Sequence, residues 1–302
     1  MLFWPPMSEK EGGRLLLVGT PIGNLEDLSP RARRALSESS VLLCEDTRVT
    51  ARLASRFGLS AERISCPAPR EKTRVADLLR RLEAGQTVAL VSDAGMPGLS
   101  DPGEHLVAAA ARAGFPVLVV PGPSAPAAAL AVSGLPAVPH LFLGFLPARA
   151  GQRRRLLQDL QDHPETLVWF EAPHRLSGSL EDAAQILGPR RCAVARELTK
   201  LHEETVRGTL DEVASVFAGR GKARGEATVV VEGSRSRGSP AETDSEELDR
   251  QIQRELALGK DKRSIARALG TRSGRPAREI YARAVELSRR QAGGGRRESK
   301  NP

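Results

Sequence analysis

The chain has 302 residues, of which 40% are hydrophobic, 27% are charged and only 3% are aromatic, and its formal net charge is +8. This composition is typical of a globular protein with an aliphatic core, and the length suits two domains of ordinary size. It excludes a membrane-spanning chain, because no apolar run approaches the roughly 18 residues that a membrane helix needs. The apolar first residues lack the basic region and the cleavage site of a signal peptide, and three distant cysteines indicate neither a disulfide framework nor a zinc site. We expect a soluble protein of the reducing cytoplasm that needs no metal.

The first half of the chain alternates short apolar runs with helix-forming stretches. Strands are expected at residues 15–18, 41–44, 87–91 and 116–120, and helices at 31–37, 49–57, 73–83 and 103–113. Ser29 before Pro30 indicates the start of the first of these helices. Runs that are apolar at every position predict strands buried on both faces, as in a parallel sheet covered by helices. Ligands of such sheets bind outside the carboxyl ends of strands, so the loops after Val18, Cys44, Val91 and Val120 should share one face.

The second half predicts another α/β domain and a helical tail. Strands are expected at residues 141–145, 166–170, 191–195 and 227–232, and helices at 153–162, 176–187, 210–218, 246–258, 262–269 and 276–291. Residues 233–245 are rich in Ser, Arg, Gly and Pro, as linkers are. We therefore expect an N-terminal disordered tail (1–13), two α/β domains (14–122 and 123–234), a linker (235–245) and a basic helical tail with a disordered end (246–302).

The loop at residues 92–103 reads SDAGMPGLSDPG and is the strongest single indication of a binding site. It holds three glycines and two carboxylates and is longer than a simple connection requires. Its approachable backbone suits an uncharged or zwitterionic ligand held by main-chain hydrogen bonds. The chain has neither the GxGxxG of a dinucleotide fold nor the GxxxxGK[ST] of a P-loop, so those cofactors gain no support.

Eight motifs in order carry a family resemblance. They are VGTPIGNL (18–25), EDTR (45–48), VSDAG (91–95), DPG (101–103), PGPS (121–124), GFLP (144–147), HRL (174–176) and RELTK (196–200). Their order and spacing resemble the ribosomal RNA small-subunit methyltransferase I family of the tetrapyrrole-methylase superfamily. The resemblance is close over residues 14–234 and loose over the helical tail. At residues 66–71 this chain has CPAPRE, where relatives usually carry a stretch of the form His-Asn-Glu.

The resemblance implies a fold and an activity. It implies two α/β domains of the tetrapyrrole-methylase type with the methyl donor, S-adenosylmethionine, in the cleft between them. It also implies methylation of the ribose 2′-oxygen of a cytidine in the decoding region of 16S rRNA in the small ribosomal subunit, by an enzyme that is commonly a homodimer. Carried over position by position, it places the donor against Pro21, Ser92, Asp93, Ala94, Gly95, Ser124, Phe145, Leu146, Ala195, Arg196 and Thr228.

Methyl transfer from a sulfonium is an in-line displacement, so catalysis is chiefly positioning of the acceptor oxygen. A neutral hydroxyl is a poor nucleophile, and a nearby base or cation should therefore help. Asp46 is the first candidate base, because it follows a strand at the expected ligand face, and Arg48 beside it could hold a phosphate. Lys200 is a third catalytic candidate, and Glu45, Asp101 and Glu171 also qualify by residue type. In the alternative interpretation Asp46 caps the following helix and Arg48 pairs with it.

Positive charge gathers toward the end of the chain. Residues 237–302 hold 16 Lys and Arg against 10 Asp and Glu, which is +6 of the total. We expect Arg263, Arg267 and Arg278 in this tail, and Arg175 in the second domain, to contact RNA. Alternatively, the tail charges form only a solvated helical face, and His174 with Arg175 caps and orients the next helix.

Two other functions stay open from the sequence. One is a methyltransferase for a small molecule, either a tetrapyrrole or a diphthamide precursor, since the superfamily shares the cleft and the donor. The other is a non-catalytic RNA-binding factor for ribosome assembly that retains the fold. Donor binding separates the second from the enzymes, and methyl transfer to RNA separates the enzymes from each other.

Overall fold

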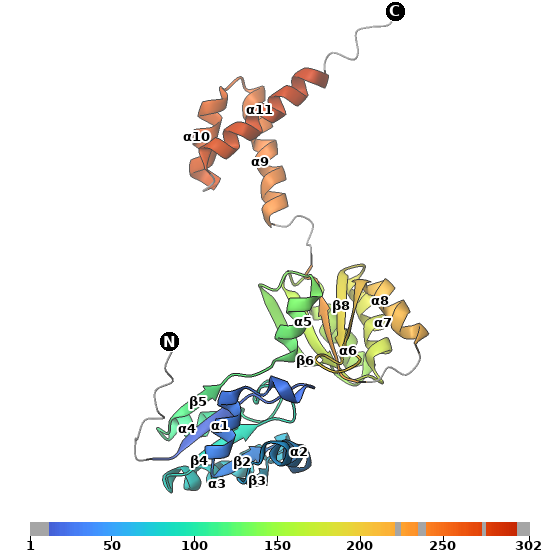
Figure 1. Ribbon diagram of the computed structural model, residues 1–302. Helices are drawn as coiled ribbons and strands as arrows, with labels where there is room; N and C mark the ends of the chain where they lie inside the picture. Colours follow the sequence, from blue (N-terminus) through green and yellow to red (C-terminus); the bar gives the residue numbers. More distant parts are fainter. Residues whose placement is uncertain (1–11, 221–224, 235–239, 274–275, 295–302) are drawn as a thin grey trace, which may run out of the picture. The chain divides into compact units, whose positions relative to one another are not determined.

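The computed structural model describes residues 12–220, 225–234, 240–273 and 276–294. The chain divides after Ser234 into two compact units, the first with two β-sheets and the second with helices only (Figure 1). None of the helices in these described ranges combines the length and the apolar character that a membrane span requires.

The first sheet is parallel, as predicted. Its strands follow the order β3-β2-β4-β1-β5, and every neighbouring pair runs in the same direction. The strands are β1 (Arg14–Val18), β2 (Val41–Cys44), β3 (Glu62–Ser65), β4 (Thr87–Val91) and β5 (Val117–Val120). All four residues of β2 are buried, in keeping with a strand covered on both faces. The sequence prediction missed β3, an edge strand with no fully buried residue.

Two pairs of helices cover this sheet. The helices are α1 (Pro30–Glu38), α2 (Thr47–Phe57), α3 (Glu71–Glu83) and α4 (Glu104–Arg112), with short 3-10 turns at Leu25–Asp27 (η1) and Ala68–Arg70 (η2). The first two pack on one face of the sheet and the last two on the other. The side chain of Ser29 accepts a hydrogen bond from the Ala32 N–H, so α1 begins at the predicted capping signal.

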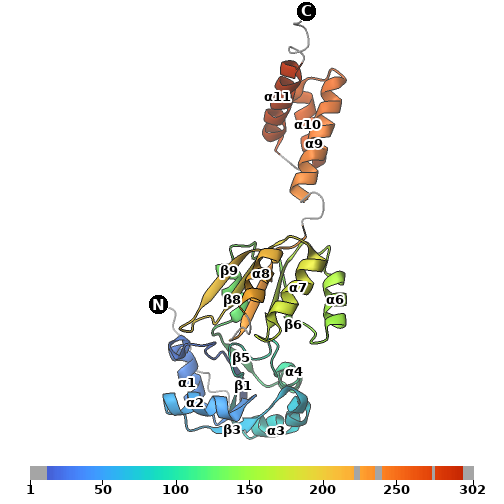
Figure 2. The same cartoon turned by 90° about the vertical axis from the view of Figure 1, so that its right-hand side faces the viewer.

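The second sheet is mixed, with the order β6-β7-β10-β8-β9. Only β6 and β7 are parallel, and the other neighbouring pairs are antiparallel. The elements are α5 (Ala125–Ser133), β6 (His140–Phe145), α6 (Ala150–Asp159), β7 (Thr166–Glu171), α7 (Leu176–Leu187), β8 (Arg191–Arg196), β9 (Glu204–Thr209), α8 (Leu210–Gly219) and β10 (Ala227–Val231). One face packs against α5 and the other against α6, α7 and α8, which lie side by side in Figure 2. The sequence prediction also missed β9, the edge strand of this sheet.

A buried carboxylate ties α6 to α7. Asp182 accepts hydrogen bonds from Arg153 Nε at 2.8 Å and Arg154 Nε at 2.6 Å, and Arg153 is itself buried. Loss of the anion leaves a buried guanidinium without its counter-charge. We expect Asp182→Asn to lower the free energy of unfolding by about 1–3 kcal/mol, measured by urea denaturation. The control Arg154→Gln, whose side chain is 54% exposed, should cost less than about 1 kcal/mol; equal losses would contradict this assignment.

The second unit is a small helical module. Its helices are α9 (Pro240–Ala257), α10 (Lys262–Ser273) and α11 (Ala277–Gly294), around a core that includes Ile252, Ile265 and Ile280. Helix α9 starts at Pro240, so the predicted linker of residues 235–245 extends too far. Proline is favoured in the first turn of a helix, where its missing N–H is not needed, and the Pro-rich composition concealed this start. The predicted tails at 1–13 and at the end of the chain lie almost entirely outside the described residues.

Candidate active site

Four loops meet at the carboxyl edge of the first sheet. Thr20 and Gly95, after β1 and β4, form a bridge in which each N–H donates to the other's carbonyl, at 2.9 and 3.1 Å. The loop after β2 joins them, because Asp46 N–H donates to Asp93 Oδ1 at 3.1 Å. The prediction that these loops share one face is confirmed.

Glycine is required for two different reasons at two places where these loops pack closely, one a backbone contact and the other a left-handed backbone conformation. A Cβ on Gly19 would lie 2.6 Å from Gly122 Cα, so the loops after β1 and β5 could not approach with larger residues. Gly144 in β6 has φ +63, and a Cβ there would lie 2.8 Å from Ser100 Oγ. The long loop of the first sheet therefore lies directly against the second sheet.

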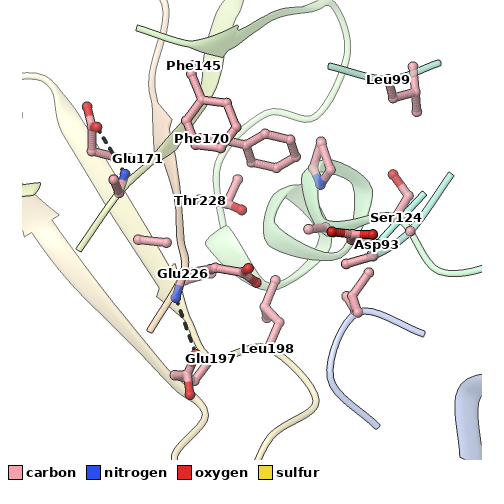
Figure 3. Close-up of a pocket in the computed structure, with 18 of the residues that line it drawn as sticks. Asp93, Leu99, Ser124, Phe145, Phe170, Glu171, Glu197, Leu198, Glu226 and Thr228 are labelled. Carbon is pink, nitrogen blue, oxygen red and sulfur yellow. Dashed lines mark hydrogen bonds between the residues drawn. The ribbon is translucent and has the colours of Figure 1, made fainter. Parts of the chain in front are cut away.

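A cavity of about 330 Å³ opens where this edge meets the second sheet. It is lined by Ile22, Asp93, Ala94, Gly95, Met96, Leu99, Asp101, Ser124, Ala125, Pro126, Phe145, Phe170, Glu171, Ala172, Pro173, Ala195, Glu197, Leu198, Lys200, Glu226, Ala227 and Thr228. Figure 3 shows Phe145 and Phe170 on one side, with Asp93 and Ser124 across from them. The two rings are tilted, with centroids 5.3 Å apart. The walls are thus aromatic and aliphatic, with a few polar groups.

Two hydroxyls on the cavity wall are available to a ligand. Ser124 stands at the N-cap of α5, but its side chain makes no capping hydrogen bond. Thr228 is 3% exposed and, among the described residues, neither hydroxyl has a hydrogen-bond partner. Hydroxyls without a protein partner beside an apolar wall are what a small-molecule site offers for orientation.

Seven of the eleven residues predicted to bind the donor line this cavity. They are Asp93, Ala94, Gly95, Ser124, Phe145, Ala195 and Thr228. The other four, Pro21, Ser92, Leu146 and Arg196, do not. The Ser92 hydroxyl lies 3.2 Å from Gly95 O and supports the loop, while Leu146 is 1% exposed within the core. Arg196 Nε lies 3.0 Å from a Glu204 carboxylate oxygen.

Asp46 and Arg48 lie outside the cavity lining. Asp46 caps α2, its side chain accepting the Arg48 N–H at 2.8 Å, and Arg48 Nη2 lies 2.6 Å from Asp46 Oδ2. The hydrogen bonds from Arg48 lower the pKa of Asp46 to about 2. A carboxylate of such low pKa is a poor proton acceptor, so the geometry favours the alternative in which Asp46 is a helix cap.

Three further carboxylates near Asp46 have the opposite shift. Burial, helped by the charge of Asp93, raises the pKa of Asp101 to about 6 despite a bond from Ser92. Burial also raises the pKa of Asp93 and the pKa of Glu45, and neighbouring carboxylates add to both shifts. Asp101 lines the cavity, and its raised pKa of about 6 lies close to neutral pH.

Lys200 lines the cavity from the second sheet and is held as a cation. Its Nζ lies 2.9 Å from Glu197 Oε1 and 3.6 Å from Glu226 Oε2. Burial opposes the charge, but the hydrogen bond to Glu197 and the charge of Glu226 outweigh it, and the pKa of Lys200 is raised. Lys200 can therefore offer positive charge but not act as a base at neutral pH.

The arginines predicted to bind RNA differ in their surroundings: one is paired inside the first unit, and three are exposed on the second unit. The guanidinium of Arg175 is engaged inside the first unit: Nη2 donates to Leu146 O at 2.6 Å, and Nε lies 3.1 Å from Glu171 Oε1. That setting suits the alternative in which this segment orients α7. Arg263, Arg267 and Arg278 are exposed on α10 and α11 of the second unit.

Sequence reasoning did not select several residues of the cavity. Phe170, at the end of β7, and Leu198, in the loop after β8, have no polar group to mark them. Asp101 qualified by type but did not stand out from the other carboxylates. Its position inside a glycine-rich loop after a buried strand was the one available signal.

Comparisons with known proteins identify the family of this chain. The tetrapyrrole (corrin/porphyrin) methylases match residues 14–214. Proteins named ribosomal RNA small subunit methyltransferase I are similar: that of Halalkalibacterium halodurans is 41% identical over 89% of this chain and 93% of its own length. The protein of that name from Mycobacterium tuberculosis is 43% identical over 93% of this chain and 98% of its own.

A solved structure is similar in fold as well. The uroporphyrin-III C-methyl transferase of Thermus thermophilus, complexed with S-adenyl homocysteine, is 26% identical, with a TM-score of 0.51 over 73% of this chain and 97% of its own. The chain therefore belongs to the tetrapyrrole methylase family, in the group of the ribosomal RNA small subunit methyltransferases I.

Proposed function

We propose that this chain is an S-adenosylmethionine-dependent methyltransferase that modifies the ribose 2′-oxygen of a cytidine in the decoding region of small-subunit 16S rRNA. The observation that carries the proposal is the similarity to proteins named for this ribosomal substrate, which spans about nine tenths of the chain, helical module included.

The cavity suits the donor. Its volume of about 330 Å³ is at the lower end for one small-molecule ligand. The rings of Phe145 and Phe170 offer a face for the adenine, and the free hydroxyls of Ser124 and Thr228 can orient polar groups. The carboxylate of Asp93 complements a cationic donor. When bound, the donor supplies an electrophilic methyl group next to a positively charged sulfur.

The residues of this chain then act on the acceptor. Asp101 is the proposed general base: it takes the proton of the 2′-hydroxyl as the oxygen–carbon bond forms and the carbon–sulfur bond breaks. Its raised pKa, about 6, suits this role better than the pKa of Asp46. Lys200, a cation that lines the cavity from the loop after β8, can stabilise negative charge that develops on the acceptor oxygen.

The test is transfer of labelled methyl from S-adenosylmethionine to purified small subunits, followed by nucleoside analysis. We expect label in one 2′-O-methylated cytidine. Label on a base nitrogen or carbon, or none at any assembly stage of the subunit, would contradict the proposal.

Methylation of a small molecule is the first rival. A tetrapyrrole would have to share the cavity with the donor, and a volume of about 330 Å³ leaves little room for both. An acceptor nucleotide that belongs to a large RNA needs only to present its ribose at the opening.

A non-catalytic assembly factor is the second rival. Such a factor has no need of partnerless hydroxyls or of carboxylates with raised pKa in a largely apolar cavity. Calorimetric titration with S-adenosylmethionine separates it from the enzymes.

The helical module is proposed to bind the ribosomal substrate. Its exposed arginines, Arg263, Arg267 and Arg278, can contact phosphates, which give affinity that weakens as salt rises. We expect removal of residues 235–302 to raise the KM for the small subunit and to flatten its salt dependence, with donor affinity unchanged. A folded, truncated enzyme with the same KM and the same salt dependence would show that the module is not a substrate contact.

A homodimer in the cytoplasm completes the proposal. The edge strand β5 exposes Leu118 and Val119, at 37% and 53%, and exposed apolar strand edges are commonly covered by a partner. Light scattering on the purified chain measures the oligomeric state directly.

A further inference from the structure

Positive charge is concentrated in one segment of the first unit. Residues 47–74, which form α2, β3, η2 and the start of α3, hold seven Lys and Arg against two Asp and Glu. Their balance is +5, out of +8 for the whole chain. The segment begins immediately after Asp46, whose N–H binds the cavity residue Asp93.

Neither acidic side chain of the segment neutralises its cations. Glu62 is paired with Arg81 of α3, with Oε2 lying 3.0 Å from Arg81 Nη1. Glu71 is buried and caps α4: its Oε1 accepts the N–H groups of Gly103, His105 and Leu106 at 2.7–3.2 Å. The charge of this segment is therefore left uncompensated locally.

Five of the seven cations remain available. Arg48 is paired with Asp46, and Arg74 Nε donates to Ser65 O at 3.0 Å. The other five are exposed, and within the described part of the chain none makes a salt bridge or a side-chain hydrogen bond: Arg52, Arg56, Arg63, Arg70 and Lys72. We call these five residues the basic edge. Elsewhere on the first unit arginines such as Arg191 and Arg220 have carboxylate partners.

The fold arranges the basic edge along one border of the first sheet. Strand β3 is the outermost strand, and α2 packs next to it (Figure 1). Arg52 and Arg56 are one helical turn apart, about 6 Å along the axis of α2. Arg63 pairs in register with Leu42, whose side chain packs on the α2 side of the sheet, so Arg63 faces the same side. Arg70 and Lys72 follow the carboxyl end of β3, which is the end at which the cavity lies.

We propose that the basic edge binds the phosphate backbone of the RNA substrate and leads it to the opening of the cavity. This inference rests on the proposed function and names a second RNA contact, distinct from the helical module. Unpaired, exposed cations along a border of the sheet that ends at its carboxyl edge, where the cavity lies, match a polyanion that extends beyond the nucleotide being modified.

The residue types favour RNA over an acidic protein. Four of the five are arginines, whose planar guanidinium binds phosphate through two hydrogen bonds and stacks on bases. In residues 47–74 only Val49, at 36%, is among the exposed large apolar side chains, whereas protein interfaces are anchored by several buried aromatic and aliphatic groups.

The test is the full-length double variant Arg52→Gln/Arg56→Gln. Its dissociation constant for naked 16S rRNA and for purified small subunits is measured at several salt concentrations. We expect the dissociation constant to rise at least about fivefold at moderate salt, and the slope of log K against log salt to fall by about 1.4 for two lost phosphate contacts. Donor affinity should not change.

The matched control is Arg112→Gln/Arg155→Gln, which removes two exposed arginines from α4 and α6. It should bind RNA as the parent chain does. Equal losses in both variants would show a general effect of net charge and overturn the proposal. Weaker binding to assembled subunits with unchanged binding to naked rRNA would show that the basic edge contacts a ribosomal protein. That result would also overturn the proposal. Because binding is read directly, a chain that binds rRNA through the basic edge yet fails to methylate it would contradict only the proposed function.

Discussion

Gly95→Leu should abolish binding of S-adenosylmethionine, with a rise in dissociation constant of at least about a hundredfold, or about 3 kcal/mol. Gly95 has φ +85 and lines the cavity, and a Cβ there would lie 3.4 Å from both Ile22 Cγ2 and Pro123 O. A leucine side chain would fill space that the donor needs, and it would strain the backbone as well. Calorimetric titration of the folded variant with the donor measures the loss.

The control for backbone strain is Gly85→Leu. Gly85 has φ +77, close to that of Gly95, but a Cβ there would meet nothing within 4 Å, and the residue is absent from the cavity lining. This substitution should cost comparable stability and leave donor affinity unchanged. If both variants lose the donor equally, or if Gly95→Leu still binds it while folded, the placement of the donor against this loop is wrong.

Buried strands were predictable because their sequences are apolar at every position. The four runs of the first domain predicted β1, β2, β4 and β5, and hence a parallel sheet with its ligand edge, but β5 is an edge strand whose Leu118 and Val119 are exposed rather than buried on both faces. The pattern failed for β3 and β9, which are edge strands with half-buried, polar sequences such as ERIS and ETVRGT. One face of an edge strand and one row of its hydrogen-bonding groups meet solvent, so apolar continuity is not required there.

The cavity was predictable in outline but not in its chemistry. The family resemblance led to seven of the residues that line the cavity, because several of its motifs lie in the loops that form the cavity. The motifs could not distinguish Asp46 from Asp101, because both follow buried strands. Only the structure shows that Arg48 pairs with Asp46 and that burial raises the pKa of Asp101. A helix cap and a general base use the same side chain, and the difference lies in partners that the sequence does not display.

Asp101→Asn should lower kcat for methylation of the small subunit by roughly a hundredfold to ten-thousandfold, the usual range for loss of a general base. Asp101 lines the cavity, and burial raises its pKa to about 6, so at neutral pH it is ionised yet more basic than an ordinary aspartate. For the parent enzyme, kcat should fall as the pH drops below about 6, because the protonated carboxyl cannot accept a proton. The Asn variant should lose this pH dependence, with donor affinity changed only slightly.

The control is Asp46→Asn. Its carboxylate lies outside the cavity and its pKa is lowered to about 2 by Arg48. Because Asn caps helices about as well as Asp, this substitution should leave the cap of α2 in place, and kcat and its acidic limb should be retained. A large fall in kcat for Asp46→Asn with an unaffected Asp101→Asn would restore Asp46 as the base.

The pH dependence of stability is a second, independent test of the raised pKa of Asp101. Because its folded-state pKa is raised above the unfolded value, the folded chain binds the proton more tightly, and stability falls as the pH rises from about 4 through about 6. An asparagine has no charge to bury, so Asp101→Asn should melt at a higher temperature than the parent chain at pH 7 to 8. The difference should shrink as the pH falls through 6 and vanish near 4, where aspartate is protonated in both states. If Asp101→Asn is slower in catalysis and more stable only above pH 6, then the ionised carboxylate of Asp101 destabilises the fold and is retained for catalysis. A variant that is less stable at every pH would instead make Asp101 a structural residue of the loop.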